Sequence, residues 1–101
     1  MFKNYDLKIK NLLKQVHLFM KGDVIGVGFR MWIKMQAEII GIKGWVRNKE
    51  NHVEAVVQGE EGKINTIINL IKRGPPTSHV KNIEISWEIP KEVFETFKIR
   101  R

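Results

Sequence analysis

The spacing of apolar residues changes its period partway along the chain, and this change limits the folds that the chain can adopt. In residues 15–22, QVHLFMKG, apolar side chains stand at every second position, which is the period of a half-buried strand. From Arg30 onward they recur at helical spacing, and Gly41 follows where a left-handed C-cap belongs. A glycine-rich stretch, residues 22–30, GDVIGVGFR, lies between the two patterns. The sequence therefore predicts a strand, a glycine loop and a helix in succession.

Two short β-rich runs follow the first helix, IKGWVRN at residues 42–48 and HVEAVVQG at residues 52–59. The three residues between them suit a hairpin, so we expect both runs to join the sheet of the first strand. The next element is predicted to be a helix that lays an apolar stripe on the sheet and ends at Gly74. That stripe has the spacing i, i+3, i+4, i+7 and consists of Ile64, Ile67, Ile68 and Ile71.

The last part of the chain returns to a strand pattern. Residues 80–89, VKNIEISWEI, alternate apolar with polar side chains, and residues 94–100, FETFKIR, predict an additional C-terminal edge strand. The order β-α-β-β-α-β is that of an α+β, ferredoxin-like sandwich, with an antiparallel sheet and both helices on one face. We expect residues 1–13 to form an N-terminal arm and residues 14–101 to form the domain.

Composition restricts the function classes. The 101 residues are 43% hydrophobic, enough for one core, and contain no cysteine. A disulfide framework, a thiolate zinc site and a cysteine nucleophile are therefore excluded. The sequence has no apolar run of about 18 residues that would span a membrane. The start of the chain, MFKNYDLKIKNLLK, has charges where a secretory signal carries its apolar stretch. We expect a cytoplasmic monomer with no membrane partner and no cofactor.

The formal net charge of +7 suits any phosphorylated partner, nucleic acid included. A single-stranded RNA module of the same element order is the strongest rival class, but its RNP1 pattern is missing from HVEAVVQG. Trp45 is expected on the open face of the sheet, whereas Trp32 and Trp87 are expected in the core. The histidines share no metal-ligand spacing, so no metal site is predicted.

The glycine loop could bind an anion. A loop between a strand and the start of a helix presents successive backbone amides, and glycines let these turn inward around a phosphate. Arg30, at the helix start, could add a planar guanidinium that binds two phosphate oxygens. The stretch matches neither GxxxxGK[ST] nor GxGxxG. From the loop alone, a tight turn without any ligand stays an equally valid interpretation.

Two segments together resemble a known family. Residues 22–30, GDVIGVGFR, resemble the acylphosphatase signature G-x-V-Q-G-V-G-F-R. Residues 44–48, GWVRN, with Val53 and Glu54, resemble the second signature of that family, G-[WY]-V-x-N-x-x-D-G-x-V-E. The resemblance continues through the helix between them and into Gly74-Pro75-Pro76. It covers nearly the whole chain from about Lys14.

The resemblance implies hydrolysis of acyl phosphates to carboxylate and inorganic phosphate, with no metal. It maps phosphoryl binding onto the side chain of Arg30 and onto a loop backbone that consists of Ile25, Gly26, Val27, Gly28 and Phe29. It maps the residue that orients the attacking water onto Asn48. Inorganic phosphate and sulfate are then expected to compete with substrate. A phosphate-binding or RNA-binding module without turnover is the alternative.

Two departures from the family pattern stand out. Ile25 replaces the family's glutamine, which removes a side chain that could hydrogen-bond in the loop, so we expect reduced activity. Asn51 and His52 replace the family's Asp-Gly in the hairpin, and histidine tolerates a positive φ less well than glycine. How firmly the turn aims Asn48 is therefore an open question at this stage.

Overall fold

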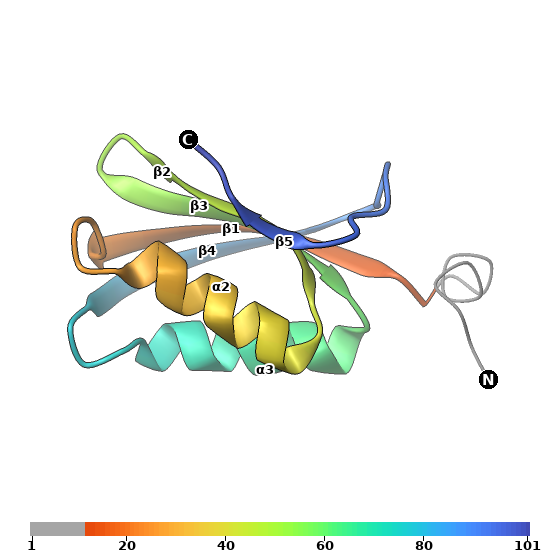
Figure 1. Cartoon of the computed structure of the whole chain (residues 1–101), viewed down its shortest axis with the longest axis horizontal. Helices are drawn as coiled ribbons and strands as arrows, with labels where there is room; N and C mark the ends of the chain where they lie inside the picture. Colours follow the sequence, from red (N-terminus) through yellow and green to blue (C-terminus); the bar gives the residue numbers. More distant parts are fainter. Residues whose placement is uncertain (1–11) are drawn as a thin grey trace.

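The computed structural model describes residues 12–101, which fold into two helices and a five-stranded sheet (Figure 1). The elements are β1 (Lys14–Asp23), α2 (Phe29–Ile40), β2 (Lys43–Lys49), β3 (His52–Gly59), α3 (Glu61–Arg73), β4 (His79–Glu88) and β5 (Phe97–Ile99). Most of the N-terminal arm expected over residues 1–13 lies outside the described residues.

The sheet has the strand order β4-β1-β3-β2-β5, and the first four of these strands are antiparallel to their neighbours. This confirms the ferredoxin-like α+β prediction. The expected edge strand is present as β5, but it runs parallel to β2, with Gly44 beside Phe97 and Val46 beside Ile99. The sheet is therefore mixed and not wholly antiparallel, because residues 89–96 carry the chain back to the β2 edge before β5 begins.

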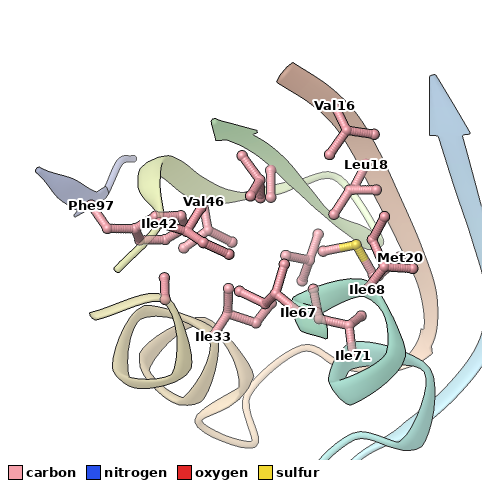
Figure 2. Packing of buried hydrophobic residues seen from close by; sticks show 14 of the residues in the cluster. Val16, Leu18, Met20, Ile33, Ile42, Val46, Ile67, Ile68, Ile71 and Phe97 are labelled. Carbon is pink, nitrogen blue, oxygen red and sulfur yellow. The ribbon is translucent and has the colours of Figure 1, made fainter. Parts of the chain in front are cut away.

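Both helices cover the same face of the sheet, and the core fills the space between the two layers (Figures 1 and 2). The alternation in β1 buries Val16, Leu18 and Met20 completely. In α2 the buried residues are Phe29, Ile33 and Ala37, and α3 buries the whole of its predicted isoleucine stripe. Gly41 takes φ 90° and its amide donates to the carbonyl of Ala37, which confirms the predicted left-handed C-cap.

One core prediction is wrong. Trp87 pairs with the buried Val16 and so lies on the helix side of the sheet, as the alternation of β4 predicts. Its side chain is nevertheless 47% exposed, because β4 is the outermost strand and neither helix reaches fully over its end. Trp32 is partly buried against the core, in agreement with its expected role.

The β2–β3 hairpin also differs in detail from the expectation. Its two turn residues are Glu50 and Asn51, and His52 already pairs with Lys49 as the first residue of β3. The positive φ that the turn requires falls on Glu50, at 56°, and His52 is not among the residues with a positive φ. The strained residue of the turn is therefore Glu50, and not Asn51 or His52.

Three connections lie at one end of the sandwich: the glycine loop between β1 and α2, the β2–β3 hairpin, and the connection from α3 to β4 (Figure 1). The hydroxyl of Thr77, in the third connection, donates a 3.2 Å hydrogen bond to the carbonyl of Val27 in the glycine loop. The topology thus brings both resembling segments to the same end of the molecule.

Candidate active site

The glycine loop has the backbone that an anion cradle needs. Gly26 and Gly28 take φ 75° and 76°, in the left-handed region that other residues avoid. A Cβ at either position would meet no atom within 4 Å, so conformation and not space requires glycine there. Among the described residues, no acceptor is found for the amides of residues 25–29, whereas the carbonyl of Gly28 accepts from Trp32. These amides are free to bind a ligand.

Gly22 has a different role from the two loop glycines. It lies within β1 at a register irregularity against β4, and a Cβ there would collide with the backbone carbonyl of His79. The first glycine of GDVIGVGFR therefore serves strand packing, and only Gly26 and Gly28 shape the loop.

Helix α2 begins directly at the loop and directs its positive end toward it. Gly28 is the N-cap and has no side chain to satisfy the first amides, and no acidic residue stands in the first turn. Arg30 occupies that first turn and forms no ion pair with another described residue. An unpaired guanidinium beside unpaired helix amides makes this end of α2 strongly attractive to an anion.

A cavity of about 180 Å³ opens where loop and helix meet. It is lined by Val24, Gly26, Gly28, Phe29, Arg30, Met31 and Ile99. Four of the residues predicted to hold the phosphoryl group, Gly26, Gly28, Phe29 and Arg30, are thus brought together. Ile25 and Val27 lie in the same loop but outside the lining, and the side chain of Ile25 is 42% exposed. Their side chains do not shape the cavity.

Met31 and Ile99 were missed from the sequence. Met31 is adjacent to Arg30 in the first turn of α2, a signal that could have indicated its place at the cavity mouth. Ile99 comes from β5, whose position beside β2 no local pattern reveals.

Asn48 lies on β2 at the same end of the sandwich. Because Val46 faces the core, the alternation of the strand places Asn48 on that same face, which also carries the cavity. Val46, two residues before Asn48, pairs with Ile99 of β5. Ile99 is one of the residues that line the cavity. Asn48 itself is not among the lining residues. The structure therefore places Asn48 near the cavity but not in its lining.

The side-chain oxygen of Asn48 has no partner. Among the described residues, its Oδ1 is the one buried side-chain polar atom that accepts no hydrogen bond. A buried carbonyl oxygen without a donor is costly, so such an atom commonly receives its hydrogen bond from water or a ligand.

A charged network lies behind Asn48, on the open face of the sheet. Glu54 is only 4% exposed and accepts hydrogen bonds from Arg47 Nε at 2.7 Å and from His17 Nε2 at 2.5 Å. Burial opposes ionisation of Glu54, but these hydrogen bonds and the adjacent positive charges outweigh it and lower the pKa of its carboxyl. The network joins β1, β2 and β3 and fixes Arg47, the residue before Asn48.

Trp45 lies on this open face, as expected, with the guanidinium groups of Arg47 and Arg100 over its ring at 5.4 and 4.7 Å. Glu54 occupies the neighbouring β3 position opposite Arg47. The carboxylate of Glu54 is thus paired within the face, which also carries two guanidinium groups beside an aromatic ring.

Within residues 12–101, no three metal-ligating side chains gather at one place. No helix in that range has the length and apolar character needed to cross a membrane.

The fold and this end of the molecule define a class: a ferredoxin-like sandwich with a glycine loop whose amides lack acceptors among the described residues, an adjacent arginine and a buried asparagine oxygen without a partner. Residues 16–99 match the family model described as Acylphosphatase. The chain belongs to the acylphosphatase family, and it is an enzyme with the activity of that family, the hydrolysis of acyl phosphates.

Similar proteins agree in sequence and in structure. An acylphosphatase of Pyrobaculum islandicum is 40% identical over 87 residues, which cover 84% of this chain and 92% of the relative. The crystal structure of acylphosphatase from Bacillus subtilis superposes with a TM-score of 0.83 at 31% identity and covers 88% of this chain and 99% of that chain. An acylphosphatase structure from Coxiella burnetii gives a TM-score of 0.85 at 29% identity, with 90% and 96% covered.

Proposed function

We propose that the enzyme cleaves the carboxyl–phosphate bond by in-line attack of water on a phosphoryl group held by the glycine loop and Arg30, without a metal ion. The water oxygen forms a bond to phosphorus while the bond from phosphorus to the acyl oxygen breaks. The electron pair of that bond leaves with the carboxylate, and a proton of the water passes to a phosphoryl oxygen. The products are a carboxylate and inorganic phosphate.

Phosphoryl binding is supported by the convergence of unpaired donors at the cavity. The amides of residues 25–29 have no acceptor among the described residues, and Arg30 has no carboxylate partner. Donors fixed in this way need no rearrangement when charge develops on the equatorial oxygens, which is the main source of catalysis in phosphoryl transfer. This convergence is the observation on which the proposal depends.

The role of Asn48 is supported by its unpaired Oδ1. An amide oxygen accepts one hydrogen of a water molecule and so fixes the direction in which the water's lone pair points. Positioning of the nucleophile is worth much in this reaction because it removes a large entropic cost. The Arg47–Glu54–His17 network behind the strand supports the position of Asn48 from the opposite face.

Neither a strong base nor a metal is needed by this mechanism. A carboxylate is a good leaving group, so little proton abstraction is required in the transition state. The guanidinium of Arg30 supplies the positive charge that a metal ion supplies in other phosphoryl-transfer sites.

The decisive experiment follows benzoyl phosphate hydrolysis by ultraviolet absorbance with EDTA present. We expect Arg30→Gln to lower kcat/KM by roughly 10²-fold or more, the usual effect of losing one transition-state donor. Asn48→Ala should lower kcat by a similar factor with KM nearly unchanged, because a bond to the attacking water is made in the transition state. Arg73→Gln and Asn82→Ala, both exposed and outside the cavity lining, are the matched controls.

Folded Arg30→Gln with full activity would refute the phosphoryl clamp, and a raised KM with unchanged kcat in Asn48→Ala would refute the water-positioning role. Loss of wild-type activity in EDTA that returns with added Mg²⁺ would refute the metal-free mechanism.

We also propose a cytoplasmic monomer. The outer strand β4 carries Lys81, Glu84 and Glu88 along its exposed surface, and charges on an edge strand oppose pairing with a second sheet. A chain without cysteine suits a reducing compartment. Elution of the chain at about 12 kDa on size exclusion would support the monomer, whereas elution at twice this mass would contradict it.

A further inference from the structure

The cavity wall beyond Arg30 is apolar, although it is open to solvent. Met31 is 54% exposed, and Ile99 is partly buried beside it. Deeper in the cavity, Val24 and Phe29 are each 1% exposed. We propose that the acyl group of the substrate lies across Met31 and Ile99, and that the site therefore prefers apolar acyl groups to acyl groups with a second negative charge. The inference rests on the proposed function, because it assigns the other half of the same substrate.

The geometry leaves one direction for the acyl group. The phosphoryl group is assigned to the end of the cavity formed by Gly26, Gly28 and Arg30, which carries loop amides without an acceptor among the described residues and the one lining cation. The remaining lining consists of apolar side chains, of which Val24 and Phe29 are closed off by the core. A cavity of about 180 Å³ has room for the phosphoryl group and the near part of the acyl group. The rest of the acyl group has to leave along the two lining side chains that reach the surface.

The charges at the cavity point the same way. Arg30 is the one charged side chain in the lining formed by the described residues, and the phosphoryl group already uses it. A second anion on the acyl group would find no further cation among the lining residues, so the lining gives it no favourable partner.

Met31 is well suited to an acyl wall of this kind. Its unbranched thioether adapts to different apolar surfaces and makes favourable contacts with aromatic rings. Met35, one turn further along α2, is similarly exposed, at 51%, but does not line the cavity. Met35 is consequently a matched control for Met31 in residue type, helix and exposure.

The test compares three substrates: acetyl phosphate, benzoyl phosphate and succinyl phosphate, which carries a second carboxylate. Residual acyl phosphate is trapped with hydroxylamine, so one assay serves all three. We expect kcat/KM to be highest for benzoyl phosphate and lowest for succinyl phosphate. Met31→Ala should lower the ratio of kcat/KM for benzoyl phosphate to that for acetyl phosphate by roughly three- to tenfold. This is a small effect for a lost apolar contact, because the wall is half open to solvent. The change should arise mainly in KM.

A second variant tests the charge argument. Met31→Lys should raise the succinyl-to-benzoyl ratio by roughly tenfold, whereas Met35→Lys, with the same net charge, should change it less than twofold. Equal effects of the two lysine variants, or a wild-type preference for succinyl phosphate, would overturn the inference. An unchanged benzoyl-to-acetyl ratio in Met31→Ala would also overturn it. These outcomes leave the proposed function intact, whereas a wild-type chain that hydrolyses none of the three substrates would refute the proposed function itself.

Discussion

Replacement of Gly28 by alanine separates the cost of a strained loop from the loss of the cradle. Gly28 has φ 76° and ψ 16°, and an alanine Cβ would meet no atom within 4 Å. The expected cost is therefore conformational only, about 1 kcal/mol for an alanine held in the left-handed region. In a domain of this size, about 1 kcal/mol lowers Tm by roughly 4–8 °C.

Gly41→Ala is the matched control for this experiment. Gly41 also takes a left-handed conformation, with φ 90° and ψ 31°, and its Cβ would only approach Lys63 Nζ, at 3.4 Å. It caps the far end of α2 and takes no part in the cavity. Both variants should therefore lose a similar amount of stability in thermal unfolding followed by circular dichroism.

Activity should distinguish the two variants. Alanine at position 28 relieves its strain by moving φ toward negative values, and this movement turns the adjacent amides away from the phosphoryl group. The loss of one aligned donor lowers kcat roughly 10²- to 10³-fold. Gly28→Ala should also weaken inorganic phosphate binding in calorimetry, whereas Gly41→Ala should keep both properties. Full activity in a folded Gly28→Ala variant with the expected loss of Tm would refute the cradle.

Three further outcomes are expected. Folding lowers the pKa of Glu54 from its ordinary value of 4.5. Its ionised form therefore stabilises the fold above pH 4.5, and this stabilisation is lost as the pH falls through the lower pKa of the folded state. Urea unfolding should therefore show a steeper acid loss of stability for wild type than for Glu54→Gln, and equal slopes would contradict this. Ile67→Ala should cost about 3 kcal/mol in urea because Ile67 is fully buried, whereas Ile39→Ala, at an exposed position of α2, should cost less than about 0.5 kcal/mol. Inorganic phosphate should inhibit competitively, and Arg30→Lys should not restore activity because an ammonium lacks the planar pair of donors; non-competitive inhibition, or an active lysine variant, would argue against the clamp.

Local periodicity predicted most of the fold. Strand alternation places Val16, Leu18 and Met20 on one face, which is buried. Helical spacing places four isoleucines of α3 on one buried stripe, namely Ile64, Ile67, Ile68 and Ile71. The geometry of the glycine loop was also predictable, since glycines at the end of a strand and an arginine at the start of a helix are features of adjacent residues. These elements depend on interactions within a few positions of the chain.

The missed features depend on contacts between distant segments. Trp87 follows the correct alternation but is exposed, because burial on an edge strand depends on what lies across from it. The contribution of Ile99 to the cavity requires β5 to lie parallel to β2, which depends on the path of residues 89–96. The positive φ at Glu50 depends on the register of the hairpin, in which Lys49 pairs with His52, and the sequence did not reveal this register.

A cradle of main-chain amides has a consequence for how this site tolerates mutation. Every residue except proline supplies an amide, so most substitutions at Ile25 or Val27 preserve the donors, and the isoleucine that replaces the family's glutamine is an example. Side-chain identity matters at the two glycines that set the loop path, at Arg30 through its guanidinium, and at Phe29 through its burial in the core. In a saturation library, we expect sharp sensitivity at Gly26, Gly28 and Arg30, restriction of the buried Phe29 to apolar residues, and wide tolerance at the exposed Ile25. Such a pattern would let the loop surface evolve toward new surroundings while the chemistry stays constant.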